Sequence, residues 1–199
     1  MDKVQRQLID TYFRKRQIAA QQSSRYKLND YELTYGVDNN KINLSKLNGG
    51  DISLVLTKRP TLADKLDLSK LDRVDIISVL TKRPTLANKL NLSELNGGDI
   101  SEILTYQPTL ANKFDLSKLD NDDIIYILRA QPTLVDKFDL SELTGDDISE
   151  ILTYQPTLAN KFDLSKLNND DITYILQAQP TLKPVFDKLK NNKININND

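Results

Sequence analysis

Apolar residues recur along this chain in a pattern with a period of 24 residues. Each period reads L-S-[KE]-L-x-x-x-D-I-x-x-[VI]-L-x-x-x-P-T-L-x-x-x-[LF]-[DN], where x stands for varied residues. Six consecutive copies, called repeats one to six and numbered from position 1 at the first Leu, occupy residues 44–67, 68–91, 92–115, 116–139, 140–163 and 164–187. A fixed period of 20–50 residues is typical of solenoid proteins.

Each repeat predicts short helices, as repeat five shows. Thr144 is the expected N-cap of the first helix, and Asp147, three residues later, is placed to form a capping box with it. Apolar residues then follow at helical spacing, at Ile148, Ile151 and Leu152. Pro156 ends this helix and begins a second one of about two turns. No segment alternates like a strand, so the sequence predicts an all-α fold, an α-solenoid of six 24-residue helix–Pro–helix repeats.

The segments outside the repeats differ from them in composition. Residues 1–28 predict a long basic helix with a net charge of +5, and residues 29–43 predict a linker or an incomplete leading repeat. Residues 188–199 are polar and predict a flexible tail. Repeat six departs from the pattern at residues 183–185, Lys-Pro-Val, as a terminal capping repeat would.

The composition limits the chemistry that the chain can perform. It has no Cys and no His, which excludes thiolate and imidazole metal sites, disulfides and a Ser-His-Asp triad. No apolar run approaches the roughly 18 residues of a membrane span. We therefore expect a non-enzymatic protein without a cofactor or metal, located in the cytoplasm, or in a host cytoplasm or virion if its source is a phage.

Charge is distributed unevenly between the repeats. Repeats one and two carry nine basic and five acidic side chains, whereas repeats three to six carry seven basic and 17 acidic ones. A basic front and an acidic rear predict head-to-tail docking or two partners of opposite sign. The alternative is an ordinary solvated surface whose charges drifted after duplication.

Two of the polar positions shared by all six repeats are candidates for a function. The Asp at position 8 is expected to cap its helix, because six equivalent copies do not single out one catalytic carboxylate. The Thr after each Pro is expected to bond locally at the start of the short helix, although a row of six hydroxyls is also suited to a repetitive ligand. Asp doublets in repeats four to six lack the spacing of a calcium loop.

Tyrosine reveals a second period of 48 residues. Repeats three and five carry Glu and Tyr at positions 11 and 15, whereas repeats four and six carry Tyr and Ala there. One interpretation is size complementarity, each Tyr packing beside an Ala of the neighbouring repeat. The other is an aromatic strip for a peptide or for stacked bases. The tyrosines concerned are Tyr106, Tyr126, Tyr154 and Tyr174.

Basic residues define a second candidate surface. Lys-Arg pairs precede the Pro in repeats one and two, at Lys58, Arg59, Lys82 and Arg83. The N-terminal helix adds the partner-binding candidates Arg6, Tyr12, Phe13, Arg14, Lys15 and Arg16. Phosphate contact is a possible use of this surface, but no Gly-rich loop or recognised nucleic-acid motif accompanies it.

The 24-residue unit, as in L-S-E-L-T-G-D-D-I-S-E-I-L-T-Y-Q-P-T-L-A-N-K-F-D, resembles short helical repeats of uncharacterised bacterial and phage proteins. It is also similar, more weakly, to mitochondrial-terminator-type repeats, which share a Leu-x-x-x-Pro-x-Leu turn and bind DNA. The first resemblance implies an α-solenoid and carries over no catalytic or binding residue. We therefore predict a helical-repeat scaffold for protein–protein interaction, a component of a large assembly such as a phage virion. The alternative is a nucleic-acid binder that uses the N-terminal helix and the first two repeats; no membrane partner is predicted.

Overall fold

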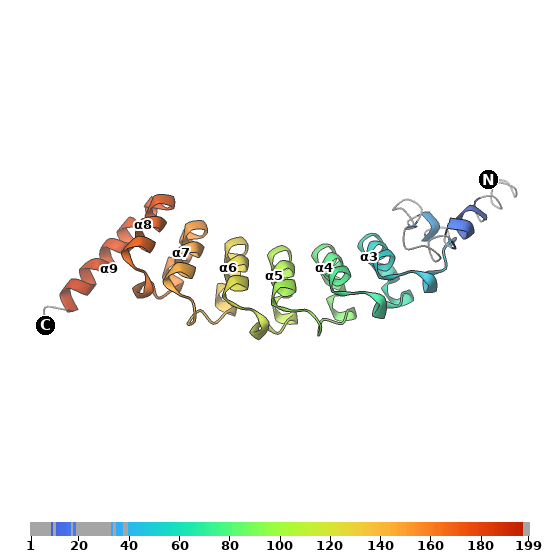
Figure 1. Cartoon of the computed structure of the whole chain (residues 1–199), viewed down its shortest axis with the longest axis horizontal. Coiled ribbons are helices and arrows are strands. Elements are labelled where there is room, and N and C mark those ends of the chain that lie inside the picture. Colours follow the sequence, from blue (N-terminus) through green and yellow to red (C-terminus); the bar gives the residue numbers. More distant parts are fainter. Residues whose placement is uncertain are drawn as a thin grey trace. The chain divides into compact units, whose positions relative to one another are not determined.

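A computed structural model describes residues 9, 11–16, 18, 33, 35–37 and 40–196, with side chains up to residue 189. These residues form helices joined by short turns and contain no strand (Figure 1). The chain divides into two compact units, Met1–Leu95 and Asn96–Asp199. The predicted all-α repeat architecture is confirmed.

Every repeat contributes one α-helix of ten residues. These helices are α3 (Gly49–Lys58), α4 (Arg73–Lys82), α5 (Gly97–Tyr106), α6 (Asn121–Ala130), α7 (Gly145–Tyr154) and α8 (Asn169–Ala178). Their apolar stripe is buried, as Ile148, Ile151 and Leu152 of α7 illustrate. Each helix ends two residues before the proline of its repeat, because proline has no N–H to continue the backbone hydrogen bonding.

The Pro-led segment that follows is a 3-10 helix. It covers six residues in repeats one to five, at Pro60–Lys65, Pro84–Lys89, Pro108–Lys113, Pro132–Lys137 and Pro156–Lys161. A further three-residue 3-10 turn opens several repeats, at Leu44–Lys46, Leu68–Lys70, Leu116–Lys118 and Leu164–Lys166. The two helices of repeats one to five therefore match the prediction, with 3-10 geometry in the Pro-led helix.

The repeated Asp at position 8 caps the helix of its own repeat in repeats two to six. In α7, the Thr144 N–H donates to Asp147 Oδ2 over 2.8 Å, and the Asp147 N–H donates to Thr144 Oγ1 over 3.3 Å. The same reciprocal pair begins α4, α5, α6 and α8. In α3, Asn48 Oδ1 accepts the Asp51 N–H over 2.9 Å. The predicted capping role of the position-8 Asp is confirmed for α4 to α8.

The described N-terminal residues form a small packed cluster in the first unit. Phe13 is buried, and its ring stacks on that of Tyr35 with centroids 5.5 Å apart. Three apolar residues close to Tyr35 in the sequence, Leu33, Val37 and Ile42, are buried as well. Residues 11–16 are helical, as predicted, and most of the remaining predicted helix over 1–28 lies outside the described residues.

A Schellman motif ends the helical residues that precede repeat one. Asn40 has φ = 54°, the left-handed conformation that such a helix end requires. Its N–H donates to Val37 O over 3.1 Å, and the Lys41 N–H donates to Gly36 O over 2.6 Å. The described part of 29–43, predicted as a linker or an incomplete repeat, therefore contains a capped helical turn.

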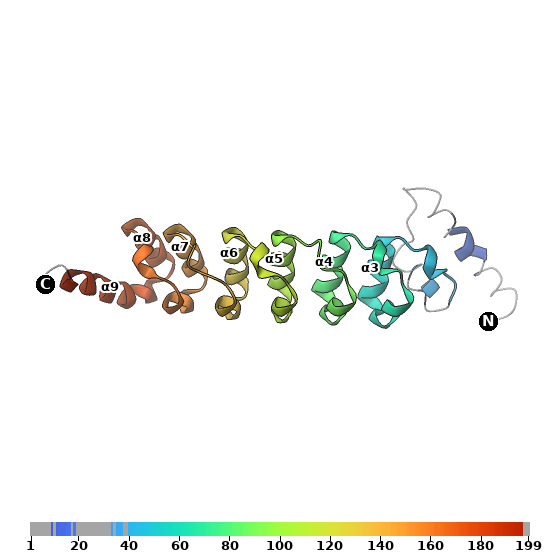
Figure 2. The same ribbon diagram turned by 90° about the horizontal axis from the view of Figure 1, so that it is seen from below.

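In the second unit, α5, α6, α7 and α8 lie side by side, with the 3-10 segments along one edge (Figures 1 and 2). Their core continues from Ile124 and Leu128 of α6 to Ile151 of α7 and Ile175 of α8. α5 packs against α6, and α7 against α8, more closely than α6 packs against α7. Packing within the unit therefore alternates with the 48-residue period.

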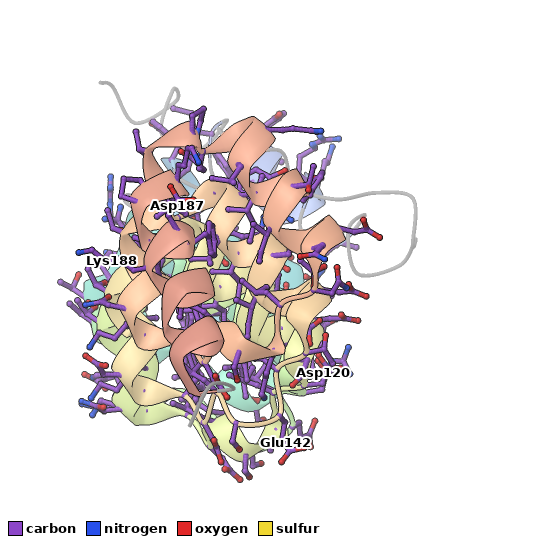
Figure 3. The ribbon with its side chains drawn as sticks, turned by 90° about the vertical axis from the view of Figure 1, so that its left-hand side faces the viewer. Asp120, Glu142, Asp187 and Lys188 are labelled. Carbon is purple, nitrogen blue, oxygen red and sulfur yellow. The ribbon has the colours of Figure 1, made fainter. Side chains whose placement is uncertain are left out.

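The helix α9 (Lys183–Ile196) closes the C-terminal end of this core. Its Phe186 is buried in the core of the second unit, and Leu189 packs against it. Asp187 and Lys188 project from α9 in the end view, away from Asp120 and Glu142 (Figure 3). The predicted cap is thus present, but residues 188–196 are helical where a flexible tail is predicted. The helix continues because Phe186 and Leu189 anchor it to the core.

Candidate interaction surface

The helices α7 and α8 enclose a groove on the exposed side of the second unit. It has a volume of about 390 Å³. Its lining consists of Asp146, Ser149, Glu150, Tyr154, Asp170, Asp171 and Tyr174. Two aromatic rings among carboxylates give a surface that is complementary to cations carrying apolar or planar groups.

Close helix packing forms the floor of this groove. A Cβ atom on Gly145, the first residue of α7, would lie 2.6 Å from Lys166 O and 2.8 Å from Asp171 Oδ2. Ser149, one helical turn later, is buried in the same contact face. Two small residues four apart allow the two helices to approach closely.

The same Gly and Ser recur in the other odd-numbered repeats. A Cβ atom on Gly97 would lie 2.5 Å from Lys118 O, and Ser101 is buried. In repeat one, Gly49 is equally close to Lys70 O, and Ser53 Oγ donates to Asp75 O over 3.4 Å. Sequence reasoning missed this feature, although Gly at position 6 with Ser at position 10 recurs every 48 residues.

Even-numbered repeats replace this Gly by a larger residue, which spaces the helices. Asn121 of α6 occupies position 6, and its Nδ2 donates to Glu142 O over 3.2 Å and to Asp147 Oδ2 over 3.3 Å. These partners are equivalent to the carbonyl and carboxylate that contact Gly97. The side-chain amide of Asn121 therefore separates α6 from α7, whereas α5 contacts α6 through the backbone of Gly97, which has no side chain.

Side chains at position 16 fix the stacking of successive repeats. Gln131 Nε2 donates to Thr105 O over 2.7 Å, and Gln179 Nε2 donates to Thr153 O over 2.8 Å. Gln155 Nε2 makes the equivalent bond to Arg129 O over 2.6 Å. Each bond satisfies a carbonyl at the C-terminal end of the preceding helix, where helices lack internal donors.

Arg83, a predicted phosphate-contact residue, makes the corresponding bond in the first unit. Its Nε donates to Thr57 O over 2.5 Å, so this predicted anion-binding residue also joins repeats one and two. Lys82 and Arg59 are exposed, and Lys58 is half-buried. The second Lys-Arg pair is therefore only partly available to a phosphate group.

Framework and surface positions behave differently when the pairs of repeats are compared. In the first helix of every pair, positions 6, 8 and 10 keep Gly, Asp and Ser. Of positions 7, 11 and 15, four residues apart on the exposed helix face, the last two differ between the first pair and the two later pairs, which share Glu and Tyr at positions 11 and 15 of this helix. The first helix of each pair presents Gly50, Leu54 and Lys58 in α3, Gly98, Glu102 and Tyr106 in α5, and Asp146, Glu150 and Tyr154 in α7.

The four predicted tyrosines lie on this variable face. Tyr106, Tyr126, Tyr154 and Tyr174 are between 50 and 62% exposed. Tyr154 and Tyr174 line one groove. The Gly and Ser contacts thus follow the same 48-residue period as the tyrosines, and the packing of Tyr beside Ala stays a prediction.

The ring of Tyr154 already stacks against a cationic side chain, that of Arg129. Arg129 Cζ lies 3.8 Å from the centroid of the Tyr154 ring, and Arg129 Nη1 lies 2.6 Å from Glu150 Oε1. All three side chains are partly exposed. The Glu–Tyr pair of α7 therefore binds a guanidinium group by stacking and ion pairing together.

The N-terminal candidates are only partly on the surface. Tyr12, Arg14 and Lys15 are exposed, and Arg16 is half-buried. Phe13, predicted as a partner-binding residue, is buried against Tyr35 and is not accessible to a partner. Arg6 lies outside the described residues.

The carboxylates of the array differ in their electrostatic setting. Partial burial, aided by the neighbouring Asp120 and Asp122 charges, raises the pKa of Asp123 above 3.8. Hydrogen bonds from the Ser two residues later lower the pKa of Asp67, Asp115 and Asp139. Within the described residues, no three acidic side chains converge to hold a metal ion.

The six Thr side chains after the prolines are exposed, from Thr61 in repeat one to Thr181 in repeat six. None of them makes a hydrogen bond in the part of the chain that the structure describes. The predicted local bond at the start of the short helix is therefore wrong. The 3-10 helix starts without a side-chain cap because the proline at its first residue presets the backbone and has no N–H.

No protein-family model, curated protein or solved structure matches this chain. None of the helices among the described residues is both long and apolar enough to cross a membrane. The class that the fold defines is the all-α repeat solenoid, and the resemblance to bacterial and phage repeats stays a prediction.

Proposed function

We propose that this chain is a non-enzymatic helical-repeat scaffold that binds protein partners through positions 7, 11 and 15 of its α-helices. The observation that carries the proposal is a contrast in the first helix of each pair: Gly, Asp and Ser at the packed positions 6, 8 and 10 are constant, whereas the exposed face differs between the first pair and the two later pairs. Four tyrosines, each at least half exposed, lie on that face. Exposed tyrosine is enriched at protein interfaces because it offers a large contact area at a small entropic cost.

The two ends of the array present different chemistry at these positions. Repeats one and two offer Leu54, Lys58, exposed Val74 and Lys82, whereas the later repeats offer Tyr with Glu and Asp. The first surface fits an acidic or apolar partner and the second fits a basic one. A chain that joins two unlike partners is suited to a structural or accessory role in a large assembly, such as a virion.

The proposal is tested by capturing partners on the immobilised full-length chain from a lysate of the organism that encodes it. Nuclease treatment and low and high salt separate protein partners from nucleic acid, and mass spectrometry identifies the proteins. The test variant replaces Tyr106, Tyr126, Tyr154 and Tyr174 by Ala. The matched control replaces four exposed Thr of the 3-10 edge, at Thr109, Thr133, Thr157 and Thr181, by Ala.

We expect proteins that survive nuclease and high salt to be retained by the wild type and the Thr control and lost by the Tyr variant. Equal capture by both variants would rule out the helix face as the binding surface. Recovery of nucleic acid alone would favour the alternative function. In that case, replacing Lys58, Arg59 and Lys82 by Ala should flatten the dependence of binding on salt.

A further inference from the structure

We propose that Glu102 and Tyr106 of α5 form a binding site for an arginine side chain of a partner protein. This inference rests on the proposed function, because it names the chemical group that a partner presents to the variable face. It is carried by a contact that the chain makes with its own arginine in the next pair of repeats.

Arg129 shows how such a site is occupied. Its Cζ lies 3.8 Å from the centroid of the Tyr154 ring, while its Nη1 lies 2.6 Å from Glu150 Oε1. Glu150 and Tyr154 are four residues apart on α7, so their side chains lie on the same helix face. Arginine suits this pair because its guanidinium is planar, permanently charged and able to stack and pair at once.

Helix α5 carries the same pair in the same local setting. Repeats three and five differ at two positions only, Asn96 against Thr144 and Gly98 against Asp146. Both helices have ten residues and begin with the same capping box. Glu102 and Tyr106 therefore stand on α5 in the relative positions that Glu150 and Tyr154 have on α7.

The α5 pair has no internal cation. Both side chains are exposed, and within the described residues neither makes a hydrogen bond, ion pair or ring contact. At repeat position 14, arginine occurs only in repeat four, as Arg129. Repeat two has Thr81 at that position, so the sequence offers no equivalent arginine ahead of α5.

The surroundings favour a basic protein segment. Repeats three to six have ten more acidic than basic side chains, which attracts cations and repels phosphate groups. Asp122 and Tyr126 of α6 are the counterparts of Asp170 and Tyr174, which line the groove between α7 and α8. Charge complementarity therefore points to an arginine-bearing segment of another protein.

The test is a titration of the full-length ¹⁵N-labelled chain with two peptides that differ only in having Arg or Lys at one position. We expect the Arg peptide to shift the backbone resonances of α5 in the wild type, with an affinity several-fold higher than that of the Lys peptide. Glu102→Gln should weaken the α5 response several-fold. Circular dichroism and thermal melting of every variant verify that it is folded.

Arg129→Ala provides the matched test, because it vacates the identical pair on α7. We expect a second set of shifted resonances at α7 in this variant, with an affinity similar to that of the α5 site. The double variant Glu102→Gln/Arg129→Ala should keep the α7 response and lose most of the α5 response. A gain of the second site would show that a Glu–Tyr pair is sufficient to bind the guanidinium.

Three outcomes would overturn the inference. They are equal responses to the Arg and Lys peptides, no α5 response in the wild type, and no new α7 response in Arg129→Ala. Shifts at α5 that grow with protein concentration alone would assign the site to a second copy of this chain instead of a partner. If partners are captured but the Arg peptide gives no response at α5, this inference alone is rejected. If the Arg peptide binds at α5 but no protein partner is captured, only the proposed function is rejected.

Discussion

Gly97 lies directly against Asp123, with no room for a side chain between them. A Cβ atom on Gly97 would overlap the Asp123 carboxylate and lie 2.5 Å from Lys118 O, a backbone atom that cannot move aside alone. We expect Gly97→Ala to destabilise the second unit by about 1–3 kcal/mol, the usual cost of overpacking. Urea unfolding followed by circular dichroism measures the loss.

The neighbouring Gly98 is the matched control. A Cβ atom there would meet only Asn96 Oδ1 at 3.6 Å, an ordinary contact, and repeat five has Asp146 at this position. Gly98→Ala should be neutral or stabilise the chain by up to about 1 kcal/mol, since Ala favours the helix more than Gly does. Equal losses from the two substitutions would contradict close packing at Gly97.

This relationship also shows what the sequence could not predict. The repeat length, the capping Asp and the proline break follow from local rules, because their partners lie within a few residues in the chain. Contacts such as Gly97 with Asp123 depend on which faces of two helices meet, and the local pattern does not specify this. The tyrosines mark the 48-residue period in the sequence, whereas the role of the glycines depends on contacts between two helices.

Gln155 tests the ladder of bonds between repeats, that is, the hydrogen bonds from the side chains at position 16 to a backbone carbonyl of the preceding repeat. Its Nε2 donates to Arg129 O over 2.6 Å, at the C-terminal end of α6. Gln155→Ala should lower the free energy of unfolding by about 1 kcal/mol, because the carbonyl loses its donor. Chemical denaturation detects the change, and Gln155→Glu should cost more because it brings a negative charge to a helix C-terminus.

Gln177 of α8 is the control for this substitution. It is exposed, and its side chain makes no hydrogen bond within the described residues. Gln177→Ala should therefore change the free energy of unfolding by less than about 0.5 kcal/mol. If both Gln→Ala variants unfold at the same denaturant concentration as the wild type, the ladder does not contribute to stability.

Phe186 tests α9 as the C-terminal cap of the array. It is 1% exposed within the core of the second unit, whereas its neighbour Val185 is 36% exposed. Phe186→Ala should cost about 3–5 kcal/mol, as for other buried aromatic side chains, and Val185→Ala less than about 1 kcal/mol. Hydrogen exchange should show the loss of protection first in α9 and α8, since stability in repeat arrays is shared mainly between neighbours.

Asp115 and its counterparts predict a component of the stability that depends on pH. Ser117 Oγ donates to Asp115 Oδ1 over 2.7 Å and its N–H donates over 3.1 Å, and these bonds lower the pKa of Asp115 below 3.8. A carboxyl group with a lowered pKa in the folded state stabilises that state above pH 3.8. This contribution is lost as the pH falls through the lowered pKa.

The substitution Asp→Asn at residues 67, 115 and 139 removes this component while keeping the acceptor. The chain provides a precedent in Asn91, whose Oδ1 accepts from Ser93 N–H over 3.1 Å and Ser93 Oγ over 2.8 Å. The triple variant should fold normally and lose less stability than the wild type between about pH 5 and about pH 2. Urea unfolding across that range measures both slopes, and parallel slopes would show that the three carboxylates do not couple to folding.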